Sequence, residues 1–415
     1  MNNMMEPKIR FKGFEGEWKD TNLGNISNNF KYGINAAAIP YDGKNKYLRI
    51  TDIDDTTHVF LQDNLTSPGA DLSYCDEYIM QDGDIVIART GASVGKSYVY
   101  HTVDGKIYFA GFLIRVRTNK EVNKDFIFQK TLTNAYTKHI QFVSQRSGQP
   151  GVNVNELKSF SFLIPRDKEE QQAIASYFTS LDSQISASTS RLASLKQMKA
   201  ASLQAMFPHE GETVPKIRFK GFEGEWKKVK LNSFAKRVTR KNSHLESTLA
   251  LTIASAHGLV SQIDYFNNLV VGSNIRNYYL LKKGEFAYNK SYSNGYPFGS
   301  VKRLDRYEQG ILSTLYITFS IDNSISSDYL THFFDTNLWH KEVAERAAEG
   351  ARNHGLLNIG ANDFLDINIW KPESKAEQQA IASYFTSLDR QISLQSQRLE
   401  KLKQIKSACL DKMFV

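Results

Sequence analysis

The chain has 415 residues, which is more than one domain usually contains, so we expect two or more hydrophobic cores. Its 52 Lys and Arg exceed its 44 Asp and Glu, and the net charge of +8 permits a polyanionic partner without demonstrating one. Two isolated cysteines, Cys75 and Cys409, exclude a disulfide framework and favour the reducing cytoplasm. No run of roughly 18 to 20 uncharged apolar residues predicts a membrane span, and the polar N-terminus lacks the apolar run of a signal peptide.

An internal repeat is the strongest signal in the chain. The 13 residues Pro7–Lys19 recur unchanged as Pro215–Lys227, and the 13 residues Glu170–Asp182 recur unchanged as Glu377–Asp389. The segments between them, about 20–165 and 228–372, have nearly the same length but little visible identity. Duplicated domains can drift apart without functional cause, but drift would scatter differences everywhere. The pattern therefore favours two interchangeable heads on one common frame.

The first insert predicts a small α+β domain with a curved sheet. Runs rich in β-branched and aromatic residues predict strands, and a helical pattern follows them. The predicted strands are Tyr47–Ile53, Asp84–Ala88, Ser97–His101 and Phe109–Val116, and the helical pattern covers Asp125–Gln141. Polar, glycine-containing segments between these elements are candidate DNA contacts, because Arg, Lys, Asn and Gln suit base edges while Ser and Thr suit phosphates. The candidates in this head are Arg89, Thr90, Ser93, Lys96, Ser97, Gln145, Arg146 and Gln149.

The segment from Glu169 to about Phe207 contains no Gly and no Pro, which predicts one long helix. Such a helix of roughly 38 residues would be about 55 Å long. Its apolar residues fall at coiled-coil spacing, although some seam positions are polar. The seam residues are Phe178, Leu181, Ile185, Leu192, Leu195 and Met206.

The second insert has counterparts of the same elements. Strands are predicted at Ala250–Ala254, Glu285–Asn289, Gly299–Arg303 and Leu312–Ser320, with a helical pattern at Ser327–Ala348. Two polar loops correspond in position to those of the first insert, which strengthens their candidacy for DNA contact. The candidates in this head are Lys290, Ser291, Tyr292, Asn294, Tyr296, Arg352, Asn353 and His354.

A second long helix is predicted from Glu373 to Val415, with seam residues Phe385, Leu388, Ile392, Leu399, Leu402 and Met413. Two equivalent helices would pair antiparallel about a pseudo-twofold axis, and the pair would hold two heads at a fixed distance. The alternative is that each helix packs on its own domain alone. The remaining apolar stripe could dock helices of a partner. The predicted fold class is α+β, with two pseudo-symmetric, mixed β-rich domains joined by two long antiparallel helices. The predicted boundaries are 1–165 and 217–372 for the domains, 166–207 and 373–415 for the helices, and 208–216 for a linker.

Catalytic motifs are incomplete or absent. Gly91–Ser97 resembles a phosphate-binding loop, but it has three residues between its glycines where four are needed, and it leads into a strand-like run. Asp366, Glu373 and Lys375 superficially suggest a nuclease triad, but Pro372 marks this stretch as a helix start. The chain contains no Asn-Pro dipeptide and no Gly-x-Gly-x-x-Gly after a predicted strand, so it lacks the motifs that would indicate a methyl-donor site. Its histidines show no metal-ligand spacing. We therefore assign no catalytic residue, metal or cofactor to this chain.

Four short motifs, together with the duplication, resemble the specificity subunits of type I restriction–modification systems. These motifs are Leu48–Ile53, Gly83–Gly91, Phe286–Ser291 and the Glu-Gln-Gln-x-Ile-Ala-x-x-Phe start of both long helices. The resemblance implies two target-recognition domains, each reading one half of a bipartite asymmetric DNA site, and helices that set the gap. It also implies two adenine-N6 methyltransferase (modification) subunits that use S-adenosylmethionine. Two ATP- and Mg-dependent restriction subunits that translocate DNA would join the endonuclease form.

Two other classes remain open from the residues alone. A standalone nuclease or ATPase would cleave DNA or hydrolyse ATP by itself and would need Lys96. A scaffold whose inserts bind proteins would show no salt-dependent binding to duplex DNA, whereas phosphate contacts make affinity fall steeply with salt. The target DNA sequence cannot be read from the chain, because base preference depends on loop geometry and DNA shape.

Overall fold

The computed structural model describes residues 6–27, 29–146, 148–255, 258–266, 274–293, 295–347 and 357–414. The chain forms two compact units, one made of Met1–Leu192 with Gln395–Val415 and the other of Ala193–Leu394. We call them the first and the second unit. The division cuts both long helices, whereas the sequence-based boundaries kept each helix whole. Each unit therefore contains one head, the beginning of one long helix and the end of the other.

The first head is built on a four-stranded antiparallel sheet of order β2-β9-β6-β7. Its strands are β2 (Asn29–Tyr32), β9 (Leu113–Arg117), β6 (Asp84–Ala88) and β7 (Ser97–Val99). Shorter pairs join β3 (Ala38–Pro40) to β5 (Thr66–Pro68), β4 (Lys46–Leu48) to β8 (Ile107–Phe109) and β1 (Lys19–Asn22) to β10 (Ser161–Ile164). The β1–β10 pair joins the two ends of the insert, so the head closes on itself.

Two of the predicted strands of this head are shorter or split. The predicted run Tyr47–Ile53 leaves the strand conformation after Leu48 and forms a 3₁₀ turn at Ile50–Asp52, because the Asp52 carboxylate accepts the Arg49 N–H (2.9 Å). The predicted run Phe109–Val116 is divided between β8 and β9 by a turn in which the Leu113 N–H donates to the Ala110 carbonyl (2.8 Å).

The helices of the first head are short. They are α1 (Leu23–Ile26), α2 (Lys124–Lys130), α3 (Asn134–Val143) and α4 (Val154–Lys158). The helix predicted at 125–141 is thus two helices. The break occurs because the Thr133 side chain accepts the Tyr136 N–H and so begins a new helix.

The second head repeats this architecture. Its four-stranded sheet has the order β12-β19-β16-β17, formed by β12 (Ala235–Arg237), β19 (Ile317–Ile321), β16 (Phe286–Asn289) and β17 (Ser300–Arg303). Two-stranded pairs are β13 (Leu251–Ala254) with β14 (Gly258–Ser261), β15 (Tyr279–Lys282) with β18 (Gln309–Leu312), and β11 (Lys227–Lys230) with β20 (Asn368–Lys371). Its helices are α6 (Gln262–Phe266), α7 (Ser327–Phe333), α8 (His340–Arg346) and α9 (Ala361–Leu365). The helix predicted at 327–348 is likewise two helices, α7 and α8.

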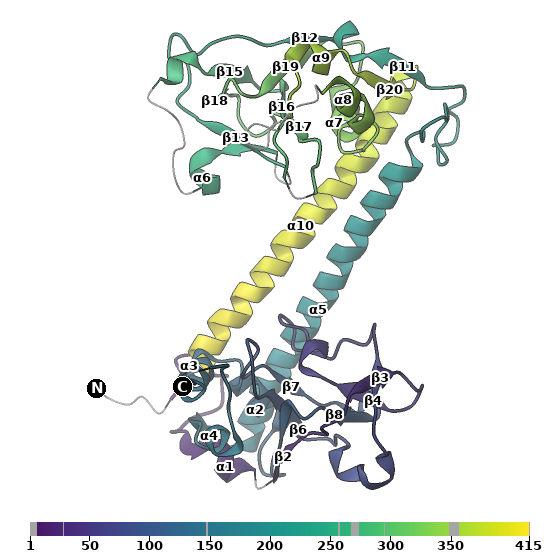
Figure 1. Cartoon of the computed structure of the whole chain (residues 1–415). Coiled ribbons are helices and arrows are strands. Elements are labelled where there is room, and N and C mark those ends of the chain that lie inside the picture. Colours follow the sequence, from purple (N-terminus) through teal and green to yellow (C-terminus); the bar gives the residue numbers. More distant parts are fainter. Residues whose placement is uncertain are drawn as a thin grey trace. The chain divides into compact units, whose positions relative to one another are not determined.

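The two long helices are confirmed as α5 (Lys168–Ala205) and α10 (Lys375–Met413) (Figure 1). Within the first unit, Asp182 of α5 pairs with Lys406 of α10 (2.6 Å), and Gln395 Nε2 donates to the Ser188 carbonyl (3.2 Å). Later residues of α5 thus meet earlier residues of α10, which is antiparallel pairing. The second unit contains the equivalent pair Lys199–Asp389 (2.7 Å). Among the described residues, no helix combines the length and apolar character needed to cross a membrane.

The predicted seam residues lie in these contacts. Phe178, Leu181, Ile185 and Leu195 of α5 are buried, as are Phe385 and Leu388 of α10, whereas Leu192, Ile392, Leu399 and Leu402 are half-buried. Just beyond the end of α10, the Phe414 ring packs against Phe126 (5.2 Å) and Phe178 (5.6 Å) in the first unit. Phe207, just beyond the end of α5, packs against Tyr329 (5.8 Å) and Phe385 (6.1 Å) in the second. Each core is therefore built from both repeats.

Candidate DNA interface

The loop after β6 and the loop after α3 lie side by side in the first head. The Val152 N–H donates to the Arg89 carbonyl (2.8 Å), and the Gly91 N–H donates to the Pro150 carbonyl (3.0 Å). The two polar loops that supplied the candidates of this head are therefore joined at Arg89–Gly91 and Pro150–Val152. We call them the first loop pair.

Three candidate contacts of the first loop pair are at least partly exposed, with Gln149 exposed and Arg89 and Thr90 half-buried. The Arg89 guanidinium stacks 4.7 Å above the Tyr32 ring, an arrangement that orients its donors. Thr90 and Gln149 line an open cavity of about 510 Å³. Side chains that sequence reasoning did not select line the same cavity, namely Asn35, Arg49, Thr51 and Phe112. The cavity thus combines hydrogen-bonding groups with an aromatic ring, a combination that can contact base edges and a thymine methyl group.

Other candidates in this head have structural partners. Lys96 Nζ donates to the Ile53 carbonyl and to Asp55 Oδ1, both at 2.8 Å, so this side chain fastens two loops together. The Ser97 side chain is fully buried and its hydroxyl bonds the Thr131 hydroxyl (2.6 Å), so its prediction as a DNA contact is wrong. Ser93 is half-buried beside Lys96. Gly91–Ser97 leads into β7, which lacks the helix N-terminus of a phosphate-binding loop.

The second loop of the first loop pair, which follows α3, is exposed at the candidate residues Gln145 and Arg146. Arg146 pairs with Glu156, which caps the start of α4 together with Asn153. Gly91 has a positive φ of 78°, and a Cβ there would lie 3.1 Å from Gln149 Nε2. Glycine at this position therefore allows Gln149 to approach the loop after β6.

The second head brings its two loops together in the same way. The Leu357 N–H donates to the Lys290 carbonyl (2.9 Å), the counterpart of the bond between Val152 and Arg89. Lys290 is half-buried with Nζ 3.5 Å from the Ile359 carbonyl, and the Tyr292 side chain is exposed. Ser291 is half-buried, with its N–H bonded to Asn289 Oδ1 (3.0 Å), and the N–H of half-buried Tyr296 bonds the Ser293 carbonyl (2.8 Å). The other candidates, Asn294, Arg352, Asn353 and His354, lie outside the described residues.

An exposed apolar residue that sequence reasoning did not select precedes the equivalent strand in each head. Phe112 precedes β9 and is 62% exposed, and its carbonyl accepts the Arg89 N–H (3.0 Å). Leu315 precedes β19, the counterpart of β9, and is 63% exposed. The signal in the sequence that could have indicated their exposure is a large apolar residue next to a turn, just before the following strand. Such residues can contact a thymine methyl group in the major groove.

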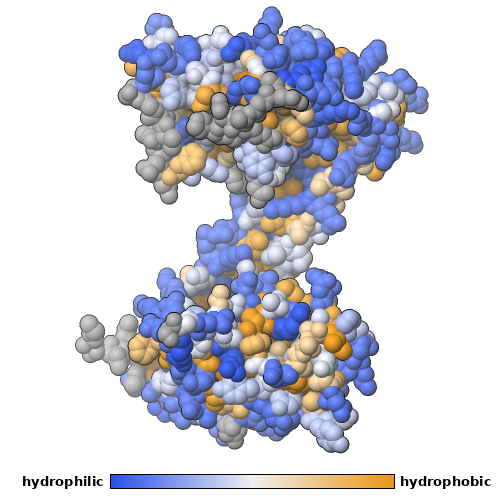
Figure 2. Space-filling model, in the orientation of Figure 1, coloured by the Kyte–Doolittle hydropathy of each residue, from blue (hydrophilic) through white to orange (hydrophobic). Residues whose placement is uncertain are grey.

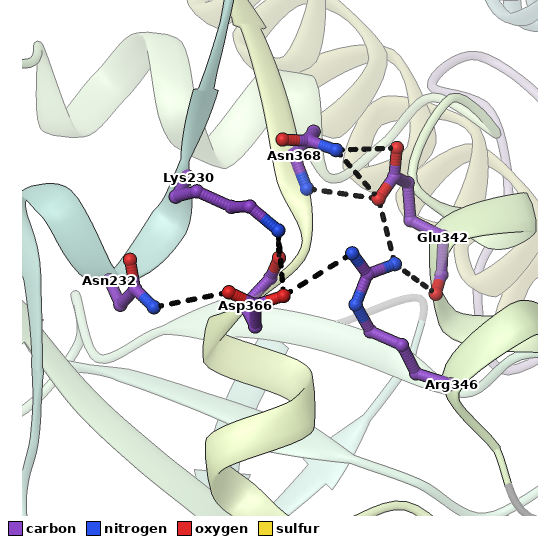
Figure 3. A network of polar contacts seen from close by, with 6 residues as sticks. All are labelled: Lys230, Asn232, Glu342, Arg346, Asp366 and Asn368. Atoms are coloured by element: carbon purple, nitrogen blue, oxygen red, sulfur yellow. Dashed lines mark hydrogen bonds and ion pairs between the residues drawn. The ribbon is translucent and has the colours of Figure 1, made fainter.

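The three residues that suggested a nuclease triad do not act together. Lys230 Nζ donates to Asp366 Oδ2 (2.6 Å), and this bond lowers the pKa of Asp366. Arg346 links Asp366 to Glu342, which also binds Asn368, so the network in Figure 3 ties α8 to strands β11 and β20. Glu373 pairs instead with Lys227, and Lys375 donates to the Asn323 carbonyl. The network is structural.

One cluster in the second unit has the composition of a metal site. Donor atoms of His332, Asp335 and Asp389 lie within 4.8 Å of one another. However, Asp335 already accepts from Lys199 and Lys302, both at 3.0 Å. Two ammonium groups neutralise the carboxylates that would attract a cation, so we assign no metal to this cluster.

Comparisons with known proteins gave a family match and similar solved structures. Residues 15–197 match the family model described as the type I restriction modification DNA specificity domain. The S subunit of a type I restriction–modification system from M. genitalium has a similar structure, with a TM-score of 0.66, 14% identity and coverage of 99% of both chains. The HsdS subunit from Thermoanaerobacter tengcongensis aligns at a TM-score of 0.42, 15% identity and coverage of 96% of both chains. None of the curated proteins searched matches this chain in sequence.

The fold thus defines a class of protein with two β-rich heads and paired long helices. Residues 15–197, which span the first head and most of α5, are similar to type I restriction–modification DNA specificity domains, and the whole chain has a fold similar to that of an S subunit of such a system. Proteins of this family carry no cofactor of their own.

Proposed function

We propose that each head reads one half of a bipartite, asymmetric DNA site through its loop pair. The observation that carries this proposal is the equivalent hydrogen bond, Val152 to Arg89 and Leu357 to Lys290, which joins two polar loops at the same place in both heads. The two heads differ in the side chains at this place, so they would read different half-sites. The net charge of +8 favours association with the phosphate backbone.

The long helices supply the second part of the proposal. They set the gap between half-sites, and their outer face docks two modification subunits, which two restriction subunits join in the endonuclease form. Apolar residues remain exposed on the helices, namely Met198 and Leu394 in the second unit and Ile405 in the first. Figure 2 shows apolar residues interspersed with hydrophilic ones on the helix surface. Exposed apolar side chains at helical spacing suit the helices of a protein partner.

The test is to map methylated adenines in cells that carry this subunit with its modification subunit. Replacing Arg89 and Gln149 by Ala is expected to relax the sequence preference in one half-site only, because a good bidentate pair contributes about 1–3 kcal/mol of discrimination. Lys44, exposed in the same head outside the loop pair, provides the control variant Lys44→Ala, which should leave the site unchanged. A change in both half-sites would contradict the assignment of one head to one half-site.

The gap is tested separately. Deleting seven residues, two helical turns, from α5 and the matching seven from α10 should alter the number of base pairs between the half-sites while both half-sites stay the same. An unaltered gap would remove the measuring role of the helices and leave the reading heads intact.

A further inference from the structure

A cavity of about 540 Å³ lies inside the first unit, between the first head and the long helices. Its walls come from residues 56–58, residues 92–96 of the loop after β6, residues 131–144 in and before α3, and the parts of α5 and α10 that belong to this unit. It shares no lining residue with the open cavity beside Thr90 and Gln149. Cavities of this volume suit small-molecule ligands, so this one is a candidate site apart from the DNA interface.

Positive charge exceeds negative charge in this cavity. Its ionisable side chains are His58, Lys96, Tyr136, Asp182, Lys403 and Lys406. Lys406 pairs with Asp182 (2.6 Å), and Lys96 pairs with Asp55 (2.8 Å), a carboxylate just outside the lining. Lys403 is half-buried, and no acidic side chain of the described residues pairs with it. Three ammonium groups therefore face two carboxylates, and one positive charge remains without a partner.

The other polar groups of the lining add no charge. Burial lowers the pKa of His58, so its imidazole is neutral at pH 7, and its Nδ1 donates to the Ser97 carbonyl (2.9 Å). Burial raises the pKa of Tyr136, which is therefore neutral as well. The exposed hydroxyl groups of Thr56 and Ser407 also line the cavity, and hydroxyl groups suit phosphate oxygens.

The second unit shows what can lie beside the equivalent lysine. Leu132 lines the cavity two residues after the end of α2, and Asp335 holds the same position after α7, each followed by Thr-Asn. The Asp335 carboxylate accepts from Lys199, the counterpart of Lys406, and from Lys302 of β17, both at 3.0 Å. In the second unit the chain thus supplies a second anion to this lysine and ties the head to α5. In the first unit, Leu132 leaves that anion out.

We propose that the cavity binds a small molecule that carries a phosphate group, whose oxygens take the place of the missing carboxylate beside Lys406 and reach Lys403. A phosphate monoester carries a charge of about −1.5 to −2 at pH 7, so it can serve both ammonium groups through charge-assisted hydrogen bonds. Apolar side chains line other parts of the cavity and suit the remainder of the molecule, among them Val94, Ile140 and Leu410. A DNA duplex is too wide to enter and could offer phosphates only at the mouth. The site does not depend on the proposed reading of DNA.

The experiment measures binding of inorganic phosphate and of AMP to the full-length chain by isothermal titration calorimetry at neutral pH. Adenosine is the uncharged control, and sodium chloride is the control for ionic strength. The phosphate-bearing probes are expected to bind and, near saturation, to raise the unfolding temperature by about 2–4 °C or more, because a ligand that binds only the folded chain stabilises it. Adenosine and sodium chloride should produce neither effect.

Two pairs of variants locate the site. Lys403→Gln removes the unpaired ammonium group and should weaken binding about tenfold or more. Its matched control is Lys196→Gln, the equivalent and exposed lysine of the second unit, which should bind as the native chain does. Leu132→Asp supplies the carboxylate that the second unit has and should abolish binding, whereas the neutral Leu132→Asn should retain it. If either Leu132 variant fails to fold, Lys403→Gln decides, because Lys403 has no ion pair that folding would lose.

The outcomes separate this site from the DNA interface. A native chain that binds neither inorganic phosphate nor AMP overturns the site, as does native-like binding by Lys403→Gln or by folded Leu132→Asp. A duplex of mixed sequence distinguishes the source of the phosphate. If Lys403→Gln weakens binding of the duplex while AMP neither binds nor competes, the cavity contacts the DNA backbone and the small-molecule site is wrong. Loss of AMP binding by Lys403→Gln with an unchanged pattern of adenine methylation supports a separate site, and failure of the proposed DNA reading would leave that result standing.

Discussion

The same position in the two units is occupied by a lysine in one and a phenylalanine in the other. Helices α2 and α7 have seven residues each and end at Lys130 and Phe333. Lys130 is 2% exposed, and its ammonium lies 5.9 Å from Trp18, 5.6 Å from Phe162 and 5.0 Å from Phe414. Phe333 is fully buried, 6.3 Å from Phe207, whose ring lies 5.8 Å from Trp226.

The difference shows what the common frame tolerates. Aromatic rings lie beside either side chain, because an aromatic ring can attract a cation with its face and can also pack against another ring. The lysine still loses its hydration, and burial lowers its pKa to about 7. The two units therefore differ in charge at this buried position, and the variants below compare the two units at equivalent positions.

The largest effect is expected where the frame is identical. Phe178→Ala and Phe385→Ala each remove a fully buried ring of the helix starts and should lower the unfolding free energy by about 3–5 kcal/mol. Chemical denaturation gives the total loss, and hydrogen exchange assigns it to one unit. The exposed Leu394→Ala is the control and should change stability by less than about 0.5 kcal/mol. Clearly unequal losses from the two Phe variants would break the equivalence of the units.

The next effect concerns the buried carboxylates at the starts of the two long helices. Glu170→Gln and Glu377→Gln leave Arg10 and Arg218 without their charged partner, and each is expected to cost about 3 kcal/mol. Both glutamates are 1% exposed, so solvent does not compensate. Thermal unfolding of the two single variants should give similar shifts. A large shift of the unfolding temperature for one variant and none for the other would show that different contacts hold the starts of the two long helices.

Lys130→Met removes a buried amine whose pKa burial lowers to about 7, and it should change how the stability of the first unit depends on pH. The pKa is lower in the folded chain than in the unfolded one, so between pH 7 and about 10.5 the unfolded chain holds a proton that the folded chain lacks. The unfolding free energy of the native protein is therefore expected to rise with pH through this window, and that of the variant should rise less. Denaturation at pH 7 and pH 9 measures both slopes. Equal slopes would contradict a lowered pKa of the folded amine.

The smallest effect concerns one contact between the long helices. Tyr177 meets Cys409 in the first unit (3.4 Å), whereas Tyr384 meets Ser202 at the equivalent place in the second (2.9 Å). Cys409→Ser converts the first contact into the second and should change stability by less than about 1 kcal/mol. Differential scanning calorimetry of the variant would detect a larger change, which would mean that the two helix pairings are not interchangeable.

Sequence reasoning located the elements better than the contacts. Strand β6 was predicted with its exact ends, because a continuous apolar run follows Asp84 between turn residues. The observed ends of helix α5 differ from the predicted ends by two residues or fewer, because a segment without Gly or Pro has few conformations that compete with a helix. Ser97 was misassigned because its polarity gives no sign of Thr131, its buried partner 34 residues away. Phe112, which is exposed, was not selected because an apolar residue next to a strand is usually core.

The sequence by itself determined the duplication, the two long helices and the placement of two variable heads on one frame, because these depend on identity and on local periodicity. Tertiary structure alone decided that each head is completed by the helix end of the other repeat, as Tyr177 meets Cys409 across 232 residues. It also decided which polar side chains face solvent and which, like Lys96, fasten loops together. Such contacts depend on chain segments that are distant in sequence, and no local pattern of residues encodes which segments will meet.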